Sequence, residues 1–152
     1  MPVITPQTAP LEVGTGEGPN ADLGPYTARL LSDAGGLTQF GAFTETLPPG
    51  SRSSRKHWHE REDEFVYLLS GRVILHEGET RTEMLPGDAA TFKAGAALGH
   101  CLENASTGDA TYLVVGTRAP DDVVHYPDDD RLLTKVNFEK TLTDRAGRPL
   151  GR

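Results

Sequence analysis

The sequence predicts an all-β domain, a sandwich or barrel built from many short strands. Three observations carry this prediction. Seventeen glycines and eleven prolines among 152 residues indicate frequent turns. Segments typical of strands recur about every eight to twelve residues, which is the spacing found in sandwiches and barrels. No stretch shows a convincing apolar period of an amphipathic helix.

The chain divides into an arm, a barrel domain and a tail. Residues 1–25 contain five prolines, so we expect an extended N-terminal arm. Residues 26–143 carry the strand signals and are predicted to form the single domain. Residues 144–152 contain Gly147, Pro149 and Gly151, and a loosely held C-terminal tail is expected.

Within the domain the strands are predicted in order, with turns between them. Tyr26–Leu31 and Leu37–Leu47 are expected to be strands joined by a hairpin connection at Ser32–Gly36. Phe65–Leu69 and Arg72–His76 are predicted to form a second hairpin through Ser70-Gly71. Further strands are expected at Thr80–Met84, Ala89–Phe92, His100–Asn104 and Tyr112–Thr117. Residues 131–138 fit either a strand or a short helix.

Composition limits the partners and the compartment. With 36% hydrophobic and 24% charged residues, the chain should fold. A net charge of −7 gives no basic excess for phosphates, so no nucleic-acid partner is expected. The single cysteine, Cys101, excludes an intrachain disulfide and fits a reducing compartment. No secretory signal and no apolar run of membrane-spanning length are visible, so we expect a cytoplasmic protein without a membrane partner.

Four side chains form a candidate metal site: His57, His59, Glu64 and His100. His57 and His59 alternate along a strand, which places both imidazoles on one face and Trp58 on the other. Neighbouring strands of a closed sheet can aim Glu64 and His100 into the same interior volume. Three imidazoles and a carboxylate suit a first-row transition metal. Four protein ligands would leave one or two coordination positions for a small molecule, as a catalytic site requires.

The frame around these residues resembles the two motifs of the cupin superfamily. Its first motif is matched by Gly50, His57, His59, Glu64 and Gly71, and its second by Gly87, Gly95, His100 and Asn104. Lys93 stands where the family usually has proline, so that turn lacks a pre-set φ, but no ligand is affected. The resemblance covers residues 40–117 well. It implies a double-stranded β-helix (jelly-roll) barrel with the metal inside.

The resemblance also implies a function class without choosing a reaction. It indicates a metal-dependent enzyme acting on a small polar organic molecule by dioxygenase, isomerase, epimerase or lyase chemistry. The cofactor would be one divalent ion of iron, manganese, nickel, zinc or copper. No separate general base is apparent, and metal-bound hydroxide or Glu64 itself is a candidate. The alternative is a non-catalytic module that binds a metal or a small ligand in a sensing or regulatory role.

A homodimer is the expected assembly, on family resemblance, with the N-terminal arm a candidate for crossing to the partner. The basic segment Arg52, Arg55 and Lys56 is interpreted as a solvated loop rather than a gate for anions. Cys101 is expected to be a small buried hydrophobe. The acidic residues of 121–130 are interpreted as a solvated connection.

Three other polar residues are expected to have structural roles. His76 and His125 have no partners at ligand spacing and are expected to be structural or exposed. Asn104 is expected to close a strand turn, with a bond to a ligand histidine as the alternative.

Overall fold

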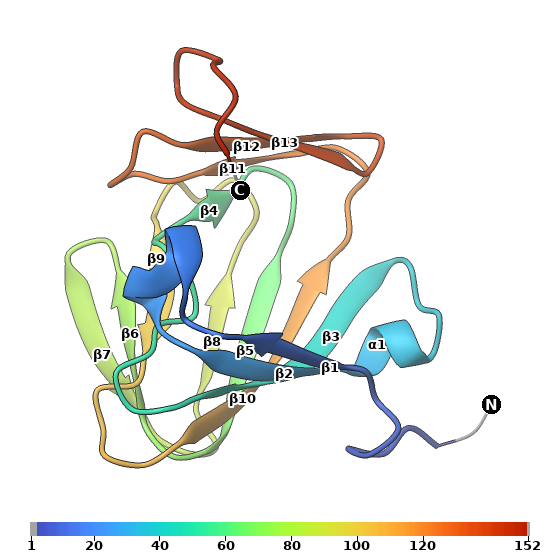
Figure 1. Cartoon of the computed structure of the whole chain (residues 1–152), viewed down its shortest axis with the longest axis vertical. Coiled ribbons are helices and arrows are strands. Elements are labelled where there is room, and N and C mark those ends of the chain that lie inside the picture. The colour runs from blue at the N-terminus through green and yellow to red at the C-terminus, as the bar shows by residue number, and fades with distance from the viewer. Residues whose placement is uncertain (1–2, 152) are drawn as a thin grey trace.

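A computed structural model describes residues 3–151, and it confirms the prediction of an all-β domain (Figure 1). The strands form three sheets, and every pairing is antiparallel. The largest sheet has the order β1 (Leu11–Gly14), β2 (Tyr26–Leu30), β3 (Phe40–Leu47), β10 (Ala110–Thr117), β5 (Glu64–Ser70), β8 (Ala89–Phe92). The second has the order β13 (Glu139–Thr143), β12 (Leu132–Val136), β11 (Asp122–His125), β4 (Trp58–His59). The third has the order β7 (Thr80–Met84), β6 (Val73–Glu77), β9 (His100–Glu103).

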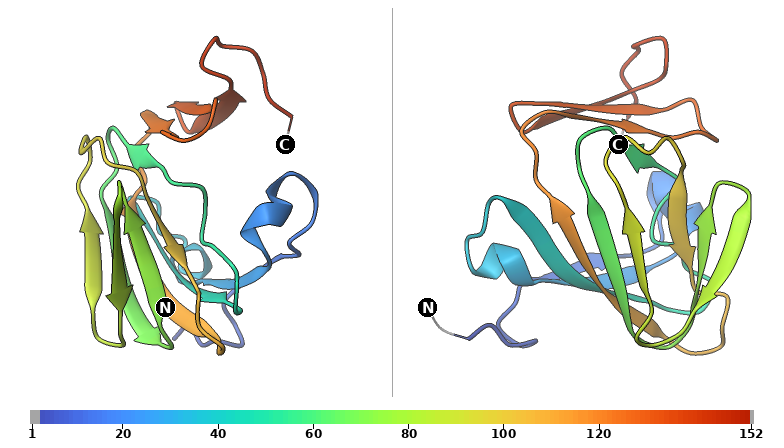
Figure 2. Two further views of the ribbon diagram at one scale, coloured as in Figure 1. Left: turned by 90° about the vertical axis from the view of Figure 1, so that its left-hand side faces the viewer. Right: turned by 180° about the vertical axis from the view of Figure 1, so that it is seen from behind.

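The six-stranded and three-stranded sheets face each other and enclose the core, while β11–β13 lie across one end (Figure 2). Alternation along β5 shows how the sequence builds this arrangement. Val66 and Leu68 are buried, whereas Phe65, Tyr67 and Leu69 are exposed on the outer face. A period of two therefore gives the sheet one apolar face for the core.

The connection at Gly71 differs from the prediction. The expected hairpin of Phe65–Leu69 with Arg72–His76 is wrong, because β5 pairs with β10 and β8 while β6 pairs with β7 and β9. Gly71 has φ of 78°, and a Cβ there would lie 2.4 Å from the carbonyl oxygen of Asp109. Only glycine fits this tight turn, which carries the chain from one sheet to the other.

The structure also tests the predicted β2–β3 hairpin and the segment that fitted either a strand or a helix. The strands β2 and β3 do pair, and the segment between them contains a short helix, α1 (Leu31–Ala34). Residues 132–136, which fitted either a strand or a helix, form the strand β12.

The described parts of both terminal segments pair with strands of the fold. Residues Leu11–Gly14 form β1 at the edge of the largest sheet, followed by a 3-10 helix, η1 (Gly18–Leu23). Near the C-terminus the N–H of Leu150 donates to the carbonyl oxygen of Leu142 at 3.0 Å. The limits of the predicted domain, 26–143, stay a prediction, and residues 1–2 of the arm and 152 of the tail lie outside the described residues. Among the described residues, none of the helices has the length and apolarity needed to cross a membrane.

Candidate metal centre

The structure brings the four predicted side chains together from three parts of the chain. His57 and His100 form a short antiparallel bridge, with N···O distances of 3.2 and 3.0 Å between their backbones. His59 lies on β4, and Glu64 is the first residue of β5. Trp58 points away from the cluster, as alternation predicts, and stacks on His125 at a ring separation of 4.2 Å.

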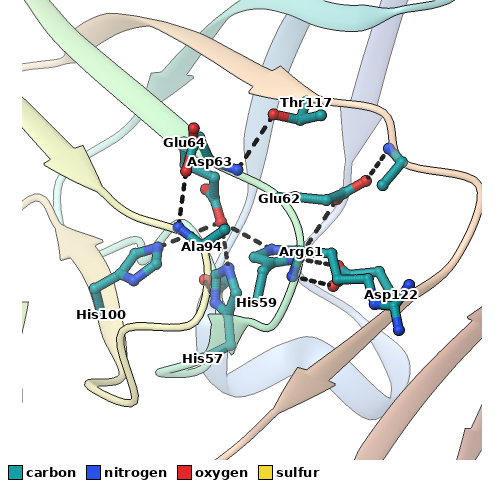
Figure 3. A network of polar contacts seen from close by, with 12 residues as sticks. His57, His59, Arg61, Glu62, Asp63, Glu64, Ala94, His100, Thr117 and Asp122 are labelled. Atoms are coloured by element: carbon teal, nitrogen blue, oxygen red, sulfur yellow. Dashed lines mark hydrogen bonds and ion pairs between the residues drawn. The ribbon is translucent and has the colours of Figure 1, made fainter.

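The donor atoms converge on one point (Figure 3). The Nε2 atoms of His57, His59 and His100 lie 3.4, 2.8 and 3.5 Å from the same oxygen, Oε1 of Glu64. This oxygen and both ring nitrogens of His100 are buried without a directed hydrogen bond. Buried polar atoms without partners are costly, and a bound cation would satisfy Oε1 of Glu64 and Nε2 of His100 together. The cluster therefore fits a metal ion through its geometry as well as its chemistry.

The rings of His57 and His59 are oriented by bonds from their far sides. Nδ1 of His57 lies 2.9 Å from the carbonyl oxygen of Arg55, and Nδ1 of His59 lies 2.7 Å from Oδ2 of Asp122. A carbonyl or carboxylate oxygen can only accept, so each Nδ1 carries the proton. In the neutral ring this leaves the lone pair on Nε2, the nitrogen that faces Glu64.

The prediction that Asp122 belongs to a solvated acidic connection is wrong. The residue is 2% exposed, and its second oxygen accepts the backbone N–H of Arg61 at 2.9 Å. The side chain thus supports His59 from within the second sheet (Figure 3). Asp122 lies on β11 and points at β4 because these two strands pair. The acidic residues around it in the sequence give no indication of that pairing.

The pKa shifts of the clustered side chains favour the binding of a cation. Burial opposes ionisation of Glu64, but contacts with the three histidines outweigh it and hold the pKa of the carboxyl well below its usual range. Burial lowers the pKa of His100, whose ring also stacks on Phe92 at 3.6 Å. Burial also opposes the charged form of His59, yet the carboxylates of Glu64 and Asp122 raise its pKa overall. A metal would compete with that proton.

A cavity of about 200 Å³ lies inside the barrel beside the cluster. Its wall includes His57, Glu64 and His100 and, further in, Glu45 and Tyr112. The hydroxyl of Tyr112, a residue 1% exposed, donates a hydrogen bond to Glu45. Burial raises the pKa of Glu45 to about 7, although the bond from Tyr112 acts against the shift.

Glu45 is a candidate functional residue that the sequence analysis missed. A signal existed: alternation puts it on the same face of its strand as Phe43 and Leu47, and Leu47 is fully buried. A carboxylate on the apolar face of a strand is costly unless it is protonated or paired.

The remaining polar residues have mostly structural partners. Asn104 donates to the carbonyl oxygens of Leu47 and Gly108 and so closes a turn, as expected. His76 lies 2.8 Å from Glu103, and His125 lies 2.8 Å from Glu60.

Cys101 is 2% exposed, and burial raises the pKa of its thiol, in keeping with the expected buried hydrophobe. The basic loop is less solvated than expected, because Lys56 donates to the carbonyl oxygen of Gly78 at 2.7 Å and Arg55 pairs with Asp22.

Comparison with known proteins identifies the class. The cupin domain model matches residues 43–116. A sugar phosphate isomerase of the cupin superfamily from Silicibacter pomeroyi is 35% identical, with 99% of this chain and 97% of that chain covered at a TM-score of 0.89. This chain belongs to the cupin superfamily, and the predicted jelly-roll barrel is thereby confirmed.

Two further proteins are similar to this chain. A candidate sugar phosphate isomerase from Acidithiobacillus ferrooxidans is 34% identical over 84% of this chain and 81% of its own, with a TM-score of 0.76. An oxalate-binding protein from Thermotoga maritima is 35% identical over 69 residues, which are 45% of this chain and 54% of that protein. The chain thus spans about half the length of the curated relative it matches.

Proposed function

We propose that the protein is a metal-dependent isomerase of a small, polar, hydroxylated molecule, with His57, His59, Glu64 and His100 as the metal ligands. The observation that carries the proposal is the convergence of three Nε2 atoms within 3.5 Å of a single buried carboxylate oxygen. Hydrogen bonds to Arg55 and Asp122 fix two of these rings in the tautomer that a metal requires.

Similarity favours isomerisation among the reactions open to cupins. Two relatives described by that activity are at least 34% identical to this chain and cover 81% or more of their own lengths. The oxalate-binding relative matches over a much shorter stretch. Isomerisation also demands little of the site, because it needs no second substrate.

The residues of the inner cavity supply what such a reaction requires. A bound metal would act as a Lewis acid toward the carbonyl and hydroxyl oxygens of the substrate. Glu45, as carboxylate, takes the proton from the hydroxyl-bearing carbon next to the carbonyl and returns it to the carbonyl carbon, while the proton of that hydroxyl passes to the former carbonyl oxygen, so the substrate only rearranges. A pKa of about 7 lets Glu45 act in both directions near neutral pH. Tyr112 holds the carboxyl in place.

A second candidate is a non-catalytic module that binds a metal and a small anion. The match to an oxalate-binding protein favours it. The same four ligands would serve both functions, so the metal alone does not separate them. The fate of a bound ligand does: an isomerase converts it, whereas a binding module returns it unchanged.

The decisive experiment combines elemental analysis with turnover. We expect about one transition-metal ion per chain in the protein as isolated, and its loss in a His57→Ala/His59→Ala double variant. His125→Ala is the matched control, because that ring stacks on Trp58 outside the cluster and should leave the metal in place. The panel of substrates consists of aldoses and ketoses with and without phosphate. Retained metal in the double variant would contradict the ligand assignment, and a metal-loaded protein that converts no substrate would favour the binding module.

A cytoplasmic homodimer is part of the same proposal. Exposed apolar side chains on the outer face of β5, Phe65, Tyr67 and Leu69, support a surface for a second copy. A monomer in light scattering at micromolar concentration would contradict it.

A further inference from the structure

A second cavity adjoins the one beside the metal centre. It is a cleft of about 410 Å³ between the N-terminal segment, the loop Arg52–Arg55 and the loop that carries Tyr126 and Arg131. The cleft and the inner cavity share Glu45, Ser53 and Ser54 as wall. The two spaces therefore meet at the proposed proton-transfer residue.

Three guanidinium groups line the cleft, and they differ in how far they are neutralised. Arg55 is paired with Asp22 of the N-terminal segment, because it donates to both carboxylate oxygens of that residue at 3.1 Å. Arg52 makes one contact of 3.3 Å with Glu103, whose other oxygen lies 2.8 Å from His76. Within residues 3–151, no carboxylate lies within 4.0 Å of the guanidinium of Arg131. Arg131 thus brings a guanidinium without a direct ion pair among the described residues to a cleft whose wall also contains Glu17 and Glu45.

Tyr126 connects this charge to the metal centre. The guanidinium of Arg131 lies 5.7 Å from the centroid of the Tyr126 ring, a cation–π distance. The Tyr126 ring also lies near His57, with 6.1 Å between the two ring centroids. Burial raises the pKa of Tyr126, so the phenol stays neutral and does not cancel the charge of Arg131. One side chain therefore separates a free guanidinium from a proposed metal ligand.

We propose that the cleft binds the phosphate group of a phosphorylated small molecule through Arg131 and Arg52, while the rest of the molecule extends past Glu45 toward the histidines. The planar guanidinium matches the oxygens of a phosphate in a bidentate manner. Size supports an extended ligand, because a molecule as small as oxalate would leave the 410 Å³ cleft empty. The inference deepens the proposed function and rests on it for the direction in which the ligand lies.

Calorimetric titration tests the subsite without turnover. The protein as isolated is titrated with fructose 6-phosphate, fructose, gluconate and inorganic phosphate. We expect fructose 6-phosphate to bind at least about tenfold more tightly than fructose, since a charge-assisted hydrogen bond is worth that much. Arg131→Ala should remove this preference, and Arg131→Lys should retain part of it. Arg72→Ala is the matched control, because Arg72 is an exposed residue outside the cleft.

The outcomes separate this inference from the proposed function. In the His57→Ala/His59→Ala variant the preference for phosphate should persist, because Arg131 and Arg52 do not depend on the metal. A preference for phosphate in the metal-loaded parent protein together with absent turnover by that protein would contradict the isomerase and keep the subsite. A preference that survives Arg131→Ala, that disappears with the metal, or that favours gluconate over fructose 6-phosphate would overturn the subsite, as would the absence of binding by every phosphate tested.

Discussion

Two carboxyl groups on the same barrel wall differ widely in their pKa values. Glu64 and Glu45 are both partly buried and both line the inner cavity. Three imidazoles surround Glu64 and keep its pKa well below the usual range, whereas Glu45 has a phenol as its partner and its pKa rises to about 7. Burial raises the pKa of both groups, and the three imidazoles outweigh it at Glu64 whereas the single bond from Tyr112 does not outweigh it at Glu45. A permanently ionised carboxylate suits a metal ligand, and one that titrates near neutrality suits proton transfer.

The largest expected effect is the loss of metal affinity on substitution of Glu64. Glu64→Gln removes the negative charge but keeps the shape, so the three Nε2 atoms lose the anion on which they converge. We expect metal affinity to fall by at least about 100-fold and turnover to be lost with it. Competition with a metal-sensitive dye measures the affinity.

Glu62→Gln serves as the control for this loss. Glu62 pairs with Lys135 at 2.6 Å and lies on the far side of His59. It should cost far less metal affinity than the change at Glu64. Equal losses in the two variants would contradict the assignment of Glu64 as a ligand.

A change at the other carboxyl should separate metal binding from chemistry. Glu45→Gln leaves all four proposed ligands in place, so the metal content should be unchanged. Turnover should fall by about 100-fold or more, because the proton would have no acceptor. Elemental analysis and initial rates on the same preparation measure both. A loss of metal in this variant, or full activity, would contradict the proposed role.

The same variant has a pH-dependent effect on stability, with a sign set by the raised pKa. The folded protein holds a proton on Glu45 up to about pH 7, but the unfolded chain releases it near the ordinary value of 4.5. Ionisation of the buried carboxyl therefore costs stability as the pH rises between these values. Glu45→Gln avoids this cost and should be more stable than the parent by roughly 1–3 kcal/mol above pH 7, with no difference below pH 4. Denaturant unfolding at pH 4 and pH 8 measures it, and equal differences at the two values would contradict the raised pKa.

The contrast between the two carboxyls also marks what the sequence could predict. Glu64 stands in an ordered motif with two histidines and framing glycines, so its place beside the histidines could be predicted from strand alternation together with the resemblance to the cupin motifs. Glu45 and Asp122 act through partners 67 and 63 residues away in the chain. Those contacts depend on which strands pair, and the turn at Gly71 shows how easily pairing is misjudged from adjacent segments. Local patterns specify faces, whereas long-range register specifies neighbours.

The smallest expected effect is a shift of the pH dependence of activity on removal of the Tyr112 hydroxyl. Tyr112→Phe keeps the volume of a fully buried ring but removes the donor to Glu45. Because that bond opposes the effect of burial, its loss should raise the pKa of Glu45 further. The acidic limb of the pH dependence of kcat/KM should then move to higher pH, with the metal content unchanged. Tyr67→Phe, on the exposed outer face of β5, is the matched control and should leave the profile in place. If the limb instead stays where it is in Tyr112→Phe while activity falls at every pH, Tyr112 acts through packing rather than through the charge of Glu45.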